Sequence, residues 1–470
     1  MAIQKTILWY DLETFGLNPR VDRIAQCAMI RTDLALNMIE DPIILYNRMT
    51  DDYLPTPESC MITHITPQEV NEKGLCEFEF IDRINREMLR PGTITAGFNN
   101  MNFDDECIRA TLYRNLFDPY ERENRMERSR WDIMNLVRAC ADLRPYGINF
   151  EKRNETGAPS CKLTDLTEQN GIEQVGAHDA CVDVYATIAV AKLIKQKQPK
   201  LYMWAFEHRF KQKVWDVIDV ERHTPFLFTH PMFVSEKGNT HPVVPLWRNK
   251  EKSNDIWGFD LTKPVPKSLD EVTDIREAGF VRIATNKCPF VAPMNVLDVD
   301  SELRLGFSRE EAELKARAIV QRCPYMFDLS PLMENISYEK ETDPDYTIYD
   351  SFLSPRDKQT LRMLNAKSPL EKLSCGEYNM DDPKYHKLLW RQVARNWPEA
   401  LSEKERTQWK NFCAGRLINP PSKFSQTMEV YMRSCEDGLN SLETTAEEKQ
   451  IYLALKNWGL ELQERILTNN

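Results

Sequence analysis

The sequence lacks the features of a membrane or secreted protein. Its 470 residues contain no apolar run of about 18 residues, the length that a transmembrane helix needs. The first five residues lead into a short apolar run and show neither the long apolar segment nor the cleavage site of a signal peptide. Twelve cysteines are few for this length, and none forms a Cys-x-x-Cys pair. We therefore expect a cytoplasmic protein with reduced, buried thiols, without disulfides or a zinc site.

An excess of positive charge is also missing. The chain has 61 Lys and Arg against 72 Asp and Glu, whereas proteins that coat nucleic acid without specificity are usually basic. A nuclease remains compatible with the net charge of −11, because a metal site itself uses several carboxylates. A basic stretch between Lys192 and Lys213 can either contact phosphates or form a solvated helix face.

Length alone suggests about three domains, and the hydrophobic pattern gives them a class. In the first 197 residues, apolar runs typical of strands alternate with the hydrophobic periodicity typical of helices. The expected strands are 6–10, 23–32, 43–46 and 93–98, and the expected helices are 104–115, 131–141 and 179–197. This order predicts an α/β domain with a mixed sheet and helices on its faces.

The pattern changes at Gln198-Pro199, since the residue before a proline disfavours helix. A helix at 201–214 should follow, then a small β-rich domain of short apolar runs separated by Pro and Gly. These runs are 225–228, 243–247, 256–261 and 280–284, with a helix near 310–321. The polar segment 339–345 predicts a second linker.

The remaining residues predict helices. The last helix should begin with a capping box made by Thr444 or Thr445 with Glu447 or Glu448. It should bury one apolar stripe: Ile451, Leu455, Trp458, Leu462 and Ile466.

Two acidic residues end the first predicted strand. Asp11 and Glu13 are two positions apart in Tyr-Asp-Leu-Glu-Thr-Phe-Gly, so both side chains project from one face of a strand. Such a pair also occurs by chance on surface strands, but this one ends an apolar run that should be central and buried. Buried carboxylates this close repel unless a cation lies between them, so we interpret the pair as a metal site.

Three further residues complete a candidate site. Asp104 opens a helical pattern, where an acidic residue can equally cap the helix. His178 and Asp183 are five residues apart and converge only if His178 lies in the loop before the helix. A lone histidine is often structural, but one outside the ligand set, with an unperturbed pKa of about 6.5, suits a general base.

The combination is more specific than its parts. Asp-x-Glu-Thr, Asn-x-x-Phe-Asp and His-x-x-x-x-Asp, in this order, resemble the histidine-containing branch of the DEDD exonuclease superfamily. Further segments resemble the bacterial exodeoxyribonuclease I family: 10–16, 51–55, 65–69, 129–132, 170–173, 183–187 and 286–289.

The resemblance implies a fold and an activity. It implies a ribonuclease-H-like α/β exonuclease domain at 1–197, an SH3-like β-rich domain at 198–338 and an all-α C-terminal domain at 339–470, around a groove for single-stranded DNA. It implies processive 3′-to-5′ degradation of single-stranded DNA to 5′-mononucleotides, with a role in DNA repair and recombination. Asp11, Glu13, Asp104 and Asp183 match the ligands of two Mg²⁺ ions, for which Mn²⁺ can substitute, and His178 matches the general base.

Substrate and partner contacts follow from the same resemblance. Glu13, Thr14, Phe15 and Phe98 are candidates for binding the terminal nucleotide. Stacking on an aromatic ring contributes about 1–3 kcal/mol per base, although both phenylalanines can equally be core residues.

The family also binds the acidic C-terminal tail of single-stranded DNA-binding protein, and Arg144 matches one basic position of that contact. Asp298 and Val320 stand where positive charge is expected. We expect a monomer.

Two alternatives remain. One is a 3′-5′ exoribonuclease of the same superfamily, which is typically a single nuclease domain, so the long remainder of this chain argues against it. The other is a noncatalytic single-strand-binding protein, which the intact set of carboxylates disfavours.

Overall fold

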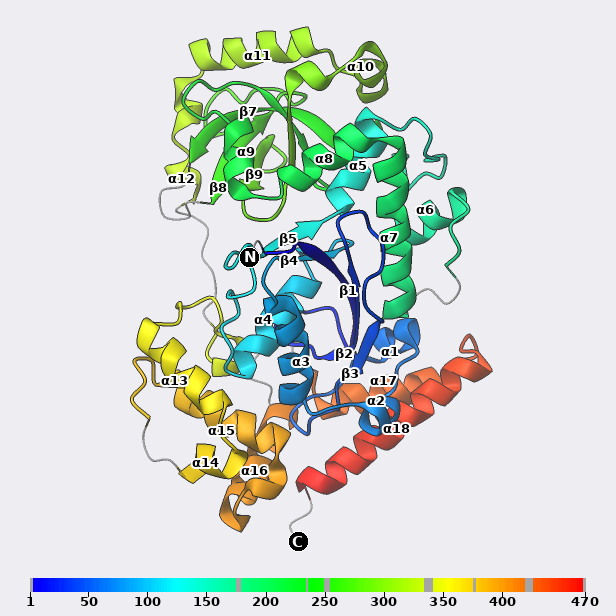
Figure 1. Ribbon diagram of the computed structural model, residues 1–470, viewed down its shortest axis with the longest axis vertical. Helices are drawn as coiled ribbons and strands as arrows, with labels where there is room; N and C mark the ends of the chain where they lie inside the picture. The colour runs from blue at the N-terminus through cyan, green and yellow to red at the C-terminus, as the bar shows by residue number, and fades with distance from the viewer. Residues whose placement is uncertain are drawn as a thin grey trace.

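The computed structural model describes residues 3–174, 179–233, 236–248, 254–333, 341–374, 378–418 and 426–467. Figure 1 shows three parts along the long axis: a sheet flanked by helices in the middle, a second sheet above it and a group of helices below. Within the described residues, no helix is long and apolar enough to cross a membrane. Most of the cysteines in this part are buried, as the sequence predicts.

The middle part is built on a five-stranded mixed sheet. Its strands are β1 (Thr6–Thr14), β2 (Ile24–Thr32), β3 (Ile43–Tyr46), β4 (Thr93–Gly97) and β5 (Ser129–Asp132). The strand order is β3-β2-β1-β4-β5, with β1 antiparallel to β2 and parallel to β4. The mixed sheet is therefore confirmed, and the acidic strand β1 is its centre.

Side chains of β1 alternate between two cores. The helices are α1 (Pro57–Thr63), α2 (Pro67–Lys73), α3 (Glu77–Leu89), α4 (Asp104–Arg114), α5 (Met134–Leu143), α6 (Leu163–Gln169) and α7 (Ala180–Lys197). Leu8 and Tyr10 pack in one cluster with residues of α3 and α4. Ile7 and Trp9 pack on the opposite face with residues of α5 and α7. Odd-numbered positions of β1 therefore face α7.

The second part is an antiparallel sheet with short helices. Its strands are β6 (Phe226–Thr229), β7 (Thr240–Arg248), β8 (Asp255–Asp260), β9 (Phe280–Ala284) and β10 (Phe290–Pro293), in the order β10-β6-β7-β8-β9. The helices are α8 (Pro199–Glu207), α9 (Lys211–Val217), η1 (Met294–Val296), α10 (Val299–Leu305), α11 (Arg309–Arg322), η2 (Pro324–Phe327) and α12 (Ser330–Met333). The predicted β-rich character of this part is confirmed.

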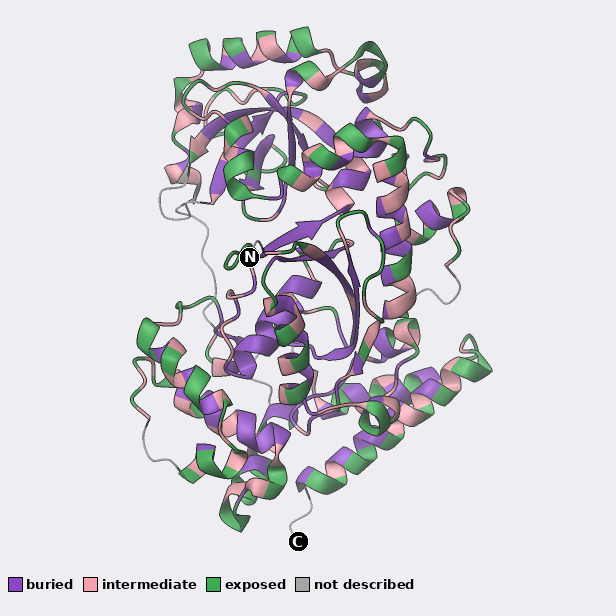
Figure 2. Cartoon of the chain, in the orientation of Figure 1, coloured by how far each residue is buried: buried purple, intermediate pink, exposed green. Residues whose placement is uncertain are grey.

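The third part is helical in the described residues. Its helices are η3 (Pro344–Tyr346), α13 (Pro355–Asn365), α14 (Pro369–Ser374), α15 (Lys384–Asn396), η4 (Pro398–Ala400), α16 (Glu403–Ile418), α17 (Met428–Asn440) and α18 (Ala446–Leu467). Thr445 and Glu448 form the predicted capping box, and the whole predicted stripe of α18 is buried. Figure 2 shows buried residues, in purple, where these helices meet the middle part, and the contacts are between helices: α18 packs on α1 and α2, and α15 on α3.

Two local predictions are wrong. The helix expected at 131–141 begins only at Met134, because Trp131 and Asp132 belong to β5 and pair with β4. A strand of four residues is too short to show its own periodicity. The helix expected at 201–214 is interrupted after Glu207, where the Arg209 side chain turns inward and donates to Ser129 Oγ at 3.1 Å.

The polar segment at 339–345, predicted as a second linker, contains buried charges. Residues 339 and 340 lie outside the described part, but Asp343 and Asp345 are buried and ion-paired with Arg391 and Arg416. Their acidic character provides partners for buried arginines, which single-sequence composition cannot distinguish from solvent exposure.

Candidate metal centre and nuclease site

Three of the predicted carboxylates meet on one face of the central sheet. Asp11 and Glu13 follow Ile7 and Trp9 in the alternation of β1, so they lie on the face that α7 covers. Asp183 lies in the first turn of α7. One oxygen from each of the three carboxylates lies within 4.8 Å of the others. That separation suits oxygen ligands of a shared divalent cation.

Asp104 reaches the same strand from a different element. It begins α4, and its Oδ1 accepts a hydrogen bond from the backbone N–H of Leu12 at 3.1 Å. Leu12 lies between Asp11 and Glu13, so Asp104 stands beside the three clustered carboxylates without belonging to the 4.8 Å group.

The neighbouring acidic residues of α4 have other partners. Asp105 is fully buried and accepts hydrogen bonds from Tyr10 Oη at 2.6 Å, Arg122 at 2.6 Å and Arg130 at 3.0 Å. Burial alone would raise the pKa of Asp105, but these arginines lower it well below its usual range. Glu106 pairs with Arg109 at 2.7 Å. Asp104 is therefore the residue of this acidic turn that is left for a cation.

Burial and mutual repulsion disfavour the charged form of the clustered groups. Burial, then the charges of Asp183, Asp104 and Asp179, raise the pKa of Glu13 to about 8. Burial and neighbouring carboxylates raise the pKa of Asp11 well above its usual value. The pKa of Asp104 rises to about 8, chiefly through burial. The charges that raise these pKa values belong to other carboxylates. A bound divalent cation would neutralise this excess of negative charge.

Three side chains fix the start of α7. Asp179 caps the helix by accepting from the backbone N–H groups of Cys181 and Val182. Gln26 lies opposite Glu13 in the β1–β2 pair and accepts from Ala180 N at 3.2 Å. Gln174 donates to Asp183 Oδ1 at 2.6 Å. Gln26 is not predicted from the sequence, because its role depends on the strand register.

His178, the predicted general base, lies outside the described residues. It directly precedes the capping residue Asp179, and only Asp179 separates it from the first helical residue of α7.

A second missed residue, Asp132, organises the approach to Asp104. Its carboxylate accepts from the backbone N–H groups of Asn99 at 2.9 Å, Met101 at 3.2 Å and Met134 at 2.9 Å. These bonds hold the turn between β4 and α4, and therefore the position at which α4 begins. Asp132 is part of the Ser-Arg-Trp-Asp motif, but it was assigned to the helix expected at 131–141 and not to the site.

The predicted substrate contacts have different surroundings. Thr14 is buried and its hydroxyl donates to Gly16 O at 2.8 Å. Phe15 is fully buried in a cluster with residues of the helical part, as the core interpretation expects, and its contact with a base stays a prediction. Phe98 is half-buried at the edge of the main core.

Arg144 links two parts of the chain. Its guanidinium lies 3.2 Å from Asp298 and donates to Val296 O at 2.6 Å, both in the second part. Asp298, which stands where positive charge was expected, is thus the partner of Arg144. This contact occupies the arginine that the sequence analysis assigned to a protein partner.

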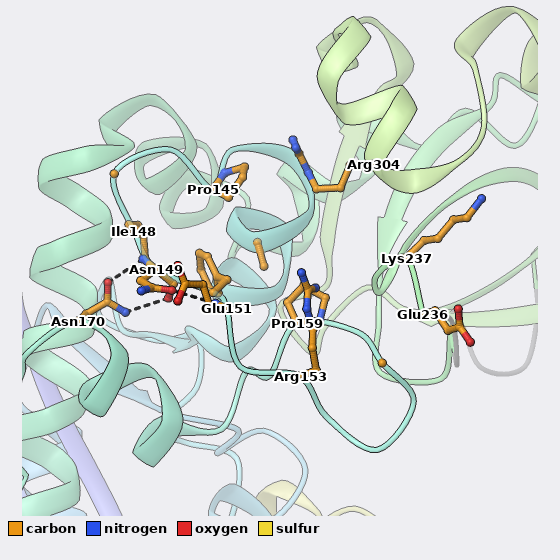
Figure 3. A pocket seen from close by; sticks show the side chains of 14 residues that line it. Pro145, Ile148, Asn149, Glu151, Arg153, Pro159, Asn170, Glu236, Lys237 and Arg304 are labelled. Atoms are coloured by element: carbon orange, nitrogen blue, oxygen red, sulfur yellow. Dashed lines mark hydrogen bonds between the residues drawn. The ribbon is translucent and has the colours of Figure 1, made fainter.

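A cavity of about 950 Å³ lies away from the carboxylates. Its lining combines the segment between α5 and α6 with Glu236, Lys237 and Arg304 of the second part, as Figure 3 shows. Asp11, Glu13, Asp104 and Asp183 do not line it. Cavity size therefore does not identify the site, and the convergence of carboxylates does.

Models of three known domains match the chain. A model described as "Exonuclease" matches residues 8–191, the exonuclease I SH3-like domain matches 209–329 and the exonuclease I C-terminal domain matches 342–462. Exodeoxyribonuclease I of Haemophilus influenzae is 37% identical over 453 residues, 92% of this chain and 95% of that protein. The chain belongs to the exodeoxyribonuclease I family.

Solved structures of the exodeoxyribonuclease I family share the fold. Escherichia coli exonuclease I in complex with a dA16 oligonucleotide is 34% identical, with a TM-score of 0.91, 98% of this chain covered and 100% of that chain. A structure of SSB with exonuclease I and an inhibitor is 34% identical, with a TM-score of 0.88 and the same coverage. The ribonuclease-H-like, SH3-like and helical architecture that the sequence predicts is thereby confirmed, and the family uses divalent metal ions.

Proposed function

We propose that this protein is a 3′-to-5′ exodeoxyribonuclease that degrades single-stranded DNA processively and releases 5′-mononucleotides in DNA repair and recombination. The observation that carries the proposal is the convergence of Asp11, Glu13 and Asp183 within 4.8 Å, with Asp104 bonded to the same strand. Membership of the exodeoxyribonuclease I family supports the reaction and the choice of DNA.

The four carboxylates would hold two Mg²⁺ ions, for which Mn²⁺ can substitute. Bound divalent cations neutralise charge on the phosphate and lower the pKa of the attacking water. Asp11 and Glu13 supply ligands from a rigid central strand, and Asp183 from the capped first turn of α7. His178 takes the proton of the attacking water as general base.

The domain boundaries we propose are 1–197, 198–338 and 339–470. Each of the three matched ranges falls inside one of these domains. The helical part makes the chain longer than a single nuclease domain, which argues against the exoribonuclease alternative.

Single-stranded DNA-binding protein is the proposed partner, supported by the solved structure that contains SSB with exonuclease I. Arg144 contributes to that contact only if it leaves Asp298, because the ion pair otherwise occupies its guanidinium. We propose a monomer that works in the cytoplasm.

The decisive experiment compares a 3′-labelled single strand with the same end in a duplex, each with Mg²⁺ and with EDTA. We expect release of labelled mononucleotide only from the single strand with Mg²⁺. RNA of the same sequence should be degraded far more slowly. Absence of nucleotide release from the single strand would support the noncatalytic alternative.

A further inference from the structure

Two aromatic side chains are exposed where the helical part meets the nuclease part. Tyr349 is 50% exposed and Phe352 is 84% exposed, both in the segment between η3 and α13. The ring centroids of Phe352 and the half-buried Tyr120 are 5.7 Å apart. Large rings left in solvent expose apolar area that folding normally covers, which indicates a binding surface.

This aromatic pair is connected to the metal centre. Tyr349 Oη donates to Glu106, which lies in the first turn of α4 two residues after Asp104. The guanidinium of Arg20 lies 6.0 Å from the centre of the Tyr349 ring. Arg20 follows β1, the strand that carries Asp11 and Glu13, so Tyr349 touches both segments that flank the carboxylates.

The charge beside the rings suits a nucleic acid backbone. Arg20 is exposed and forms no ion pair with any residue that the structure describes. Arg109 beneath Tyr120 is instead held by Glu106 and Glu123. Exposed rings with an available cation are the combination that binds single strands without reading sequence, since every base has a π face.

We propose that Phe352 and Tyr349 are substrate-positioning residues that stack bases of single-stranded DNA upstream of the cleaved 3′ end, with Arg20 on an adjacent phosphate. The inference rests on the proposed function and adds residues to it. It also gives a physical reason for single-strand preference, because bases inside a duplex are already stacked on both faces and offer none to the rings.

Binding of a labelled 20-nucleotide strand in EDTA tests the proposal without cleavage. Phe352→Ala should raise Kd roughly 5- to 150-fold, the loss of one stacked base. Phe352→Trp keeps a ring and should bind about as tightly as the wild type. Leu442→Ala removes a fully exposed apolar side chain between α17 and α18 and serves as the matched control with unchanged Kd.

A strand with abasic upstream nucleotides separates stacking from a general surface effect. The wild type should bind it as weakly as Phe352→Ala binds the normal strand, and the substitution should then have no further effect. An unchanged Kd for Phe352→Ala on the normal strand, or a full additional loss on the abasic strand, overturns the proposal.

Hydrolysis of a dinucleotide with Mg²⁺ distinguishes this proposal from the nuclease assignment. A dinucleotide offers only the scissile bond and no upstream base for the Phe352 ring, so its cleavage by the wild type tests the nuclease assignment alone. If the wild type cleaves the dinucleotide but Phe352→Ala binds the long strand normally, only the stacking proposal fails. If the wild type cleaves nothing while Phe352→Ala still weakens binding, only the nuclease assignment fails.

Discussion

Among single residues, the acidic groups of the site lie where burial and neighbouring carboxylates disfavour their charged form. Glu13 and Asp104 are buried beside other carboxylates, and their pKa values rise to about 8. Such an arrangement costs folding free energy unless a cation compensates it. The cost is therefore evidence that the site exists for a ligand of opposite charge.

Replacing one metal ligand should separate chemistry from binding. Asp11→Asn or Asp183→Asn should lower the cleavage rate by roughly 10³-fold, because the loss of a ligand weakens metal assistance that contributes several kcal/mol. Affinity for single-stranded DNA should stay within a few-fold, as measured by anisotropy. Near-normal turnover in either variant contradicts the assignment.

The raised pKa of Glu13 predicts a pH effect on stability. Folded Glu13 keeps its proton up to about pH 8, whereas the unfolded group loses it near pH 4.5, so unfolding releases a proton between these values. The free energy of unfolding in EDTA should therefore fall as pH rises from about 4.5 to 8.

Bound Mg²⁺ should offset this fall, so its stabilising effect on the melting temperature should be larger at pH 8 than at pH 5. Scanning calorimetry with Mg²⁺ and with EDTA measures the difference. Glu13→Gln should reduce the pH dependence in EDTA, and equal Mg²⁺ effects at both pH values speak against a coupled carboxylate site.

At the scale of elements, the segment after β1 is held by a buried tyrosine. Tyr53 Oη lies 3.0 Å from Phe15 O and 2.9 Å from Asp22 Oδ1, and Asp22 also accepts from Asn18 N at 2.7 Å. A Cβ on Gly16 would lie 2.2 Å from the Asp22 carboxylate, so glycine is required there. These contacts fix the chain just beyond Glu13.

Tyr53→Phe should lower the free energy of unfolding by about 1–3 kcal/mol, because it leaves buried acceptors without their donor. Urea unfolding measures this change. Tyr146→Phe is the control, since Tyr146 is exposed and its hydroxyl donates to the exposed Asp300, so little change is expected. Equal effects of both substitutions would show that the Tyr53 hydroxyl does not hold the segment after β1.

At the scale of the whole molecule, a buried ion cluster joins the nuclease and helical parts. Asp52 of the nuclease part contacts Arg395 and Arg416 of the helical part, each at 2.8 Å, and Arg416 also lies 2.8 Å from Asp345. Burial would raise the pKa of Asp52, but Arg395, Arg23 and Arg416 lower it well below its usual range. The cluster fixes the position of the helical part relative to the nuclease part.

Arg416→Met should destabilise the protein by about 3–5 kcal/mol, because it leaves buried carboxylates without compensation. Thermal unfolding and the docking of the helical part, followed by limited proteolysis, measure this effect. Arg433→Met removes an exposed pair with Glu429 and should be nearly neutral. A neutral Arg416→Met would show that the cluster is not needed for docking.

Local motifs and periodicity were enough to predict the family, the three-part architecture and the identity of the acidic residues. The alternation of side chains along a strand is enough to place Asp11 and Glu13 on one face. His178 and the individual site roles stay predictions, as do the domain boundaries.

The three-dimensional packing shows which residues around those motifs face each other. It buried Phe15, paired Arg144 with Asp298, placed Asp343 of the predicted linker in a buried ion cluster and left Phe352 exposed. Each of these outcomes depends on contacts between segments far apart in the chain. The residues adjacent in sequence do not predict such contacts, since burial and charge pairing arise only when the parts pack together.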